Sequence, residues 1–109
     1  MITVDQERFK QDHDYQKIIT DFETIQTAVN DPNLTAFFGV PSENIQHLFI
    51  LLKTAKKFFE KTLQNGKTNE VTLKEHLVDV IKYRDELNQI INTAKMARTK
   101  AQILVTERQ

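Results

Sequence analysis

The sequence of 109 residues predicts an all-α fold: an antiparallel bundle of three long helices plus one short connector helix, with a long last helix. Only two Gly and two Pro occur, so the turn residues of a β-sandwich or barrel are scarce. Helix-forming residues are abundant, and apolar residues recur at helical spacing in three long stretches. This length supports one modest core, so we expect residues 1–109 to form a single helical-bundle domain.

The first long helix is expected to run from about Asp5 to Asn30. Thr3 followed by Gln6 is a capping-box pattern at its start. The apolar residues that recur at intervals of three and four are Tyr15, Ile18, Ile19, Phe22, Ile25 and Val29. One face of this helix should therefore point into the core.

A short connector helix is expected from Asn33 to Phe38, stopping at the following glycine. Asp31 and Pro32 supply an N-cap and a first-turn proline for it. Phe37 and Phe38 lie at its end, and connector aromatics usually plug the end of a bundle. The alternative is that they form a hydrophobic docking patch for a partner.

The next long helix is expected from about Ser42, as its cap, to Gln64. It should end where Gly66 can take the left-handed conformation. On a helical wheel its apolar residues fall within an arc of about 180°, which is wide enough for the helix to pack against two neighbouring helices. These residues are Leu48, Phe49, Leu51, Leu52, Ala55, Phe58, Phe59 and Leu63.

A basic stripe formed by Lys53, Lys57 and Lys61 lies on the opposite side of the same helix, and Ile50 falls within it. A stripe of this kind can follow nucleic-acid phosphates, but such domains typically have a pI above about 9, whereas this sequence has a pI of 6.8. No Tyr, Phe or Arg interleaves with the lysines to stack bases. A solvated face or an acidic protein partner is therefore favoured over nucleic acid.

The last helix is expected to begin with a second capping box, Thr72 with Glu75, and to continue without Gly or Pro. Its apolar positions follow a seven-residue repeat, which we call the seam. The seam comprises Leu77, Val80, Leu87, Ile91, Ala94, Ala101 and Val105, with Arg84 and Arg98 in the two remaining positions. An arginine in a seam is tolerated if it pairs with a carboxylate, and it can fix register or oligomeric state.

This helix is too long for a compact domain. From Thr72 to Val105 it would measure roughly 50 Å, against a diameter of about 34 Å for a compact domain of this size. The apolar group Ala101, Ile103, Leu104 and Val105 would then lie beyond the core. We expect a second copy or another protein to cover it, with a homodimer seam that includes Arg84, Arg98, Ala101, Leu104 and Val105. Fraying of the last two turns is the alternative.

Charge is unevenly distributed although the whole chain is neutral. Residues 1–31 carry seven acids and three bases, a net charge of −4, and residues 32–109 carry eight acids and twelve bases, a net charge of +4. An acidic first helix packed beside basic later helices would cancel these fields. Asp14 and Asp21 are possible partners for the seam arginines.

Catalytic and metal sites lack their usual parts. The two glycines each fall at a helix end, cysteine is absent, and Ser42 is the only serine. His13, His47 and His76 occur one per long helix without a Glu-x-x-His motif. We therefore expect no enzyme activity, cofactor or metal. The lack of cysteine, of a signal-peptide pattern and of a membrane-length apolar run predicts a cytoplasmic protein.

The expected function is that of a small protein–protein interaction module, an adaptor or regulator that acts by helix-face docking. Candidate partner-binding residues are Ile50, Lys53, Lys57, Lys61, Phe37 and Phe38. One alternative is a bacterial or phage accessory protein that neutralises a partner, of immunity or antitoxin type. A second is weak nucleic-acid binding through the basic stripe.

Overall fold

The computed structural model describes residues 6–66 and 68–108, and within them every regular element is helical. The helices are α1 (Gln6–Phe9), α2 (His13–Val29), α3 (Pro32–Thr35), α4 (Ser42–Asn65) and α5 (Glu70–Arg108). Three of them are long, so the predicted all-α class with three long helices and a short connector is confirmed.

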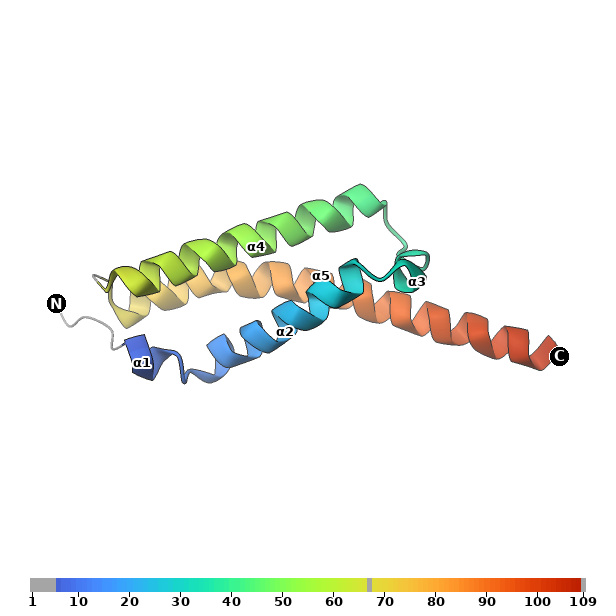
Figure 1. The fold of residues 1–109 in the computed structure, drawn as a ribbon, viewed down its shortest axis with the longest axis horizontal. Coiled ribbons are helices and arrows are strands. Elements are labelled where there is room, and N and C mark those ends of the chain that lie inside the picture. Colours follow the sequence, from blue (N-terminus) through green and yellow to red (C-terminus); the bar gives the residue numbers. More distant parts are fainter. Residues whose placement is uncertain (1–5, 67, 109) are drawn as a thin grey trace.

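Helix α5 organises the fold, because both α4 and α2 pack along it (Figure 1). Helices α4 and α5 lie side by side from the loop that joins them, and α2 crosses α5 nearby. The C-terminal part of α5 continues past the other helices and gives the molecule dimensions of 66 × 25 × 17 Å. Its radius of gyration is 17.5 Å, larger than the ~13 Å of a compact domain of this length.

The predicted first helix is divided in two, so its expected continuity from Asp5 to Asn30 is wrong. Helix α1 ends at Phe9, and α2 begins at His13 after a short turn. The side chain of Asp12 accepts hydrogen bonds from the backbone N–H groups of Asp14 and Tyr15, at 3.0 and 3.2 Å, and so caps α2. This cap starts a new helix just before Tyr15, the first residue of the apolar repeat, whereas the capping-box pattern had indicated one helix from Asp5. The proposed Thr3 cap lies outside the described residues.

The connector follows its predicted chemistry. Asp31 caps α3 by accepting a hydrogen bond from the Asn33 backbone N–H at 3.0 Å, and Pro32 occupies the first turn. The helix itself ends at Thr35, earlier than expected. Helix α4 has Pro41 at its N-cap without a side-chain cap bond, so Ser42 is the first helical residue and not the cap.

Helix α5 begins earlier than its expected capping box. The side-chain oxygen of Asn69 accepts a hydrogen bond from the Thr72 backbone N–H at 2.8 Å, so Thr72 lies inside the first turn and is not the cap. The helix then continues to Arg108. The terminal turns are therefore helical, and the fraying alternative does not describe this structure.

The core combines one face each of α2, α4 and α5 with Phe9 of α1 and Leu34 of α3. Its buried members are Phe9, Tyr15, Ile18, Ile25, Ala28, Val29, Leu34, Ile45, Phe49, Leu52, Phe59, Leu63, Leu73, Leu77, Val80, Leu87, Ile91 and Ala94. An aromatic cluster closes the end near α1, where the rings of Phe9 and Tyr15 lie 5.8 and 5.5 Å from that of Phe59. Phe58, expected on the apolar arc, is exposed because it lies at the edge of that arc.

Candidate protein-docking surfaces on the last helix

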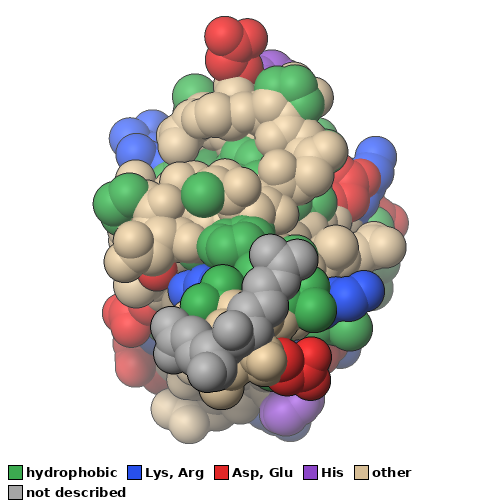
Figure 2. Space-filling view, turned by 90° about the vertical axis from the view of Figure 1, so that its right-hand side faces the viewer, with side chains coloured by type: hydrophobic (Ala, Val, Ile, Leu, Met, Phe, Trp, Pro, Cys, Tyr) green, Lys and Arg blue, Asp and Glu red, His purple; other side chains and the backbone are tan. Residues whose placement is uncertain are grey.

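The end of α5 carries three consecutive large apolar residues that are exposed. We call residues 99–108 the α5 projection, since they follow Ala94, the last α5 residue described as buried, and Arg98, which pairs with the residue that caps α3. At 1.5 Å per residue the projection is about 15 Å long. Ile103, Leu104 and Val105 are exposed on it. Figure 2 looks at this end of the molecule and shows hydrophobic side chains near the end of the chain, with both basic and acidic side chains around them.

One face of the projection continues the seam. Within the bundle, Leu87 and Ile91 occupy seam positions that α2 and α4 bury. Beyond the bundle the same repeat reaches Ala101, which is half-buried, and Val105, which is exposed. Leu104 flanks these residues on the same side of the helix. Ala101, Leu104 and Val105 form the seam face of the projection. This face is apolar like the buried part of the seam, but it lies beyond the core of the bundle.

The two seam arginines both meet acids of their own chain. Arg84 is nearly buried, and its Nε lies 3.7 Å from Oδ2 of Asp21, one of the two acids expected as partners. Its Nη2 also lies 3.0 Å from Oδ1 of the neighbouring Asp85. Helix α2 thus covers Arg84, which leaves this side chain unavailable to a second copy.

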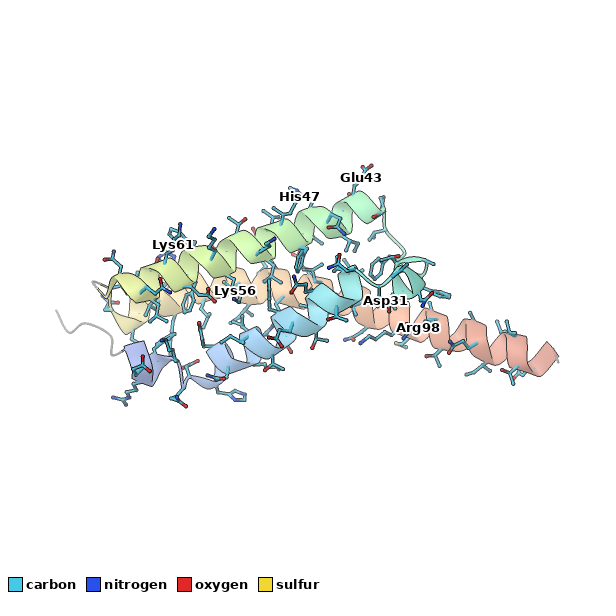
Figure 3. The ribbon with its side chains drawn as sticks, viewed as in Figure 1. Asp31, Glu43, His47, Lys56, Lys61 and Arg98 are labelled. Carbon is cyan, nitrogen blue, oxygen red and sulfur yellow. The ribbon has the colours of Figure 1, made fainter. Side chains whose placement is uncertain are left out.

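Arg98 marks the point where α5 leaves the bundle. Its Nη1 lies 3.9 Å from Oδ2 of Asp31, the residue that caps α3, and Figure 3 shows the two side by side. An open hollow of about 480 Å³ lies at this junction. Its lining comes from α2, α3, α5 and the α3 cap: Glu23, Thr24, Thr27, Ala28, Asp31, Leu34, Lys95 and Arg98. Four of the lining residues are charged: the acids Glu23 and Asp31 and the bases Lys95 and Arg98.

The basic stripe lies on the outside of α4, where Lys53, Lys57, Lys61 and Ile50 are all exposed. Figure 3 shows Lys61 and His47 along the outward side of this helix. Lys56, beside the stripe, instead pairs within α4, where its Nζ lies 2.6 Å from Oε1 of Glu60, and it also lies 4.9 Å from the ring of Phe22 on α2.

The remaining sequence candidates are placed as follows. Phe37 and Phe38 are half-buried and pack against the core, as residues that plug the end of a bundle would. The ring of His76 meets that of Phe58 edge-on at 5.0 Å. Among residues 6–66 and 68–108, no group of three or more His, Asp or Glu side chains could hold a metal ion. In the same ranges no helix is long and apolar enough to cross a membrane.

Sequence reasoning did not identify a second apolar line on α5. Val71, Val78 and Met96 are exposed there together with Ile103, on the side opposite the seam. The signal was present as intervals of 7, 18 and 7 residues, but the seam of the same helix dominated the pattern. We call these four residues the outer face of α5.

The described surfaces fit binding by shape, apolar contact and charge. Comparison with protein-family models, with curated proteins and with solved structures finds no match to this chain. The physical features of α4 and α5 are therefore the basis for a functional proposal.

Proposed function

We propose that this protein is a small protein–protein interaction module, an adaptor or regulator, that binds another protein through the seam face of the α5 projection. The observation that carries the proposal is the continuation of a buried heptad repeat past the end of its own bundle. Ala101 and Val105 occupy the heptad positions of Leu87 and Ile91, which are buried farther back along α5, and Leu104 lies beside them. An exposed apolar strip of this kind, which we call the ridge, is usually covered by a helix or a groove of a partner protein.

The chemistry of the projection indicates what would cover it. Lys100 is exposed on the projection, and Lys95 is exposed just before it. A 15 Å ridge offers little area to a flat surface, so a partner that encloses it in an apolar groove would bind more tightly. Acidic residues at the rim of that groove would complement these bases. The lack of cysteine is consistent with a cytoplasmic setting for this interaction.

The test places a photoreactive amino acid at Val105 and identifies the protein to which it cross-links in native cells. We expect one specific product, and we expect the double variant Leu104→Asp/Ala101→Asp to lose it because charge on the ridge opposes burial. Phe58→Asp is the matched control, since it places the same charge on an exposed apolar position of α4 that lies outside the proposed binding surfaces. Unchanged cross-linking in the Leu104→Asp/Ala101→Asp variant would refute the proposal.

An immunity or antitoxin-type protein would use the same projection but would inhibit its partner. The cross-linked partner itself decides between the two roles. If the partner is a toxic enzyme whose activity falls on adding this protein, the neutralising role is correct. If its activity is unchanged, the adaptor role is correct.

The exposed basic stripe supports a second candidate function, weak nucleic-acid binding. Phosphate contacts strengthen as salt falls, so affinity for random DNA should be measurable near 50 mM salt and should vanish at higher salt. The triple variant Lys53→Glu/Lys57→Glu/Lys61→Glu should abolish it. No affinity at low salt would eliminate this function.

A further inference from the structure

The outer face of α5 is apolar at both ends of the helix. The exposed fractions of its residues are 69% for Val71, 60% for Val78, 72% for Met96 and 52% for Ile103. At 3.6 residues per turn these four positions fall within about 40° of one another around the helix. They therefore form one line on the side of α5 that neither α2 nor α4 covers.

The spacing along this line is symmetric. Val71 and Val78 are separated by seven residues, as are Met96 and Ile103, and the two pairs have the same midpoint at Leu87. If two copies of α5 lie antiparallel about a two-fold axis at Leu87, Val71 meets the partner's Ile103. Val78 then meets the partner's Met96. One register thus brings all the apolar residues of both outer faces into contact.

Charge along α5 favours the same orientation. Residues 70–86 carry five acids and three bases, a net charge of −2, whereas residues 88–104 carry three bases and no acid, a net charge of +3. Antiparallel pairing places each acidic half beside the basic half of the partner, and Glu75 falls next to the partner's Lys100. Parallel pairing would place like charges together.

The available area separates this arrangement from pairing of the projections alone. Two projections overlap along about 15 Å and would bury roughly 300 Å² in total, assuming a contact strip about 10 Å wide. Outer faces paired over residues 70–104 overlap along about 52 Å and would bury roughly 1,000 Å², near the lower limit for a specific interface.

We propose that two copies of this chain pair antiparallel through the outer faces of α5. The two-fold axis passes between these faces at the level of Leu87, whose own side chain lies in the core. This inference goes beyond the proposed function and uses a different surface. The seam face of each projection stays free for another protein. The dimer would present two such faces, one at each end.

Cysteine cross-linking tests the register, because the natural chain contains no cysteine. In the double variant Val71→Cys/Ile103→Cys, a short bis-maleimide should give a covalent dimer. Each single variant should remain uncross-linked, since equivalent residues would lie about 48 Å apart at 1.5 Å per residue. Mixing the two single variants should restore cross-linking. A dimer formed by Ile103→Cys alone would overturn the proposal, because it would indicate that the projections pair with each other.

Sedimentation equilibrium and small-angle X-ray scattering test the assembly itself. We expect dimers at tens of micromolar, with a length of about 70 Å from side-by-side pairing. End-to-end pairing of two 66 Å molecules through their projections would instead give about 117 Å. Val78→Asp/Met96→Asp should return the protein to 12.8 kDa with unchanged helical circular dichroism. A wild-type mass of 12.8 kDa at 100 μM would also refute the dimer.

The two proposals fail separately. Leu104→Asp/Ala101→Asp should abolish partner cross-linking and leave the dimer intact, whereas Val78→Asp/Met96→Asp should have the opposite effect. If one double variant abolished both interactions while remaining folded, the assignment of two surfaces would be wrong.

Discussion

Two adjacent phenylalanines on α4 have very different surroundings. Phe59 is 1% exposed and lies in the aromatic cluster with Phe9 and Tyr15, whereas Phe58 is 55% exposed. Phe59→Ala should lower the free energy of unfolding by about 3–5 kcal/mol, since it leaves a cavity in the core. Phe58→Ala is the matched control and should cost under ~1 kcal/mol. Urea denaturation measures both, and equal losses would contradict the described packing.

The phenol of Tyr15 should make stability depend on pH in the alkaline range. Burial, with a further contribution from the charge of Glu60, raises the pKa of Tyr15 above its ordinary value of 10.0. The unfolded tyrosine therefore ionises before the folded one. Stability from the neutral phenol is fully present below pH 10 and is lost as the pH rises through the higher folded pKa.

Urea denaturation of wild type and Tyr15→Phe across pH 8 to 11 measures this effect. The difference in unfolding free energy between the two proteins should be constant below about pH 9.5 and shift in favour of Tyr15→Phe above pH 10. A difference that stayed constant to pH 11 would show that burial does not perturb this phenol.

Some residue contacts could be predicted from sequence and others could not. The acidic first segment and the two seam arginines predicted ion pairs, and Asp21 was one of two candidate partners of Arg84. The choice of Asp21 over Asp14 depends on how α2 crosses α5, and a linear sequence does not contain that angle. Phe58 and Phe59 likewise differ in exposure. How much of the apolar arc is buried depends on how α4 packs against its neighbours, which the sequence does not give.

At the scale of elements, the two glycines have different roles. Gly66 ends α4 with φ of 70°, a left-handed conformation that L side chains disfavour. Gly66→Ala should cost about 1 kcal/mol in unfolding free energy. A Cβ added at Gly39 would meet nothing within 4 Å. Gly39→Ala should therefore be neutral or slightly stabilising, and thermal unfolding of the two variants gives the comparison.

Helix ends were less predictable than helices. The apolar repeat correctly indicated three long helices. The break before Asp12 was missed because the Thr3 and Gln6 capping-box pattern placed the start of the first helix ahead of it, whereas the apolar repeat begins only at Tyr15. The Thr72 capping box had the right residue types, but Asn69 lies three residues earlier and caps the helix instead. Competing caps close together differ by about 1 kcal/mol, so tertiary packing chooses between them.

At the scale of the whole molecule, the residues that stabilise the fold and the residues proposed to bind a partner lie in different parts of the chain. Among the residues whose burial is described, the buried ones lie between Phe9 and Ala94, whereas residues 99–107 are exposed or, in the case of Ala101, half-buried. The length of α5 predicted a projection, and the structure retains it as helix. The outer face was not recognised because its symmetry has meaning only when a second copy is considered.

A chain shortened to residues 1–99 tests this separation. It keeps Arg98 and its contact with Asp31 but removes Ile103, Leu104 and Val105. We expect the unfolding free energy of the monomer to change by less than about 1 kcal/mol, because exposed residues contribute little to stability. Circular dichroism should lose only the helical signal of the removed residues. A loss of several kcal/mol, measured at concentrations where both proteins are monomeric, would mean that the projection packs against its own bundle and is not free to bind a partner.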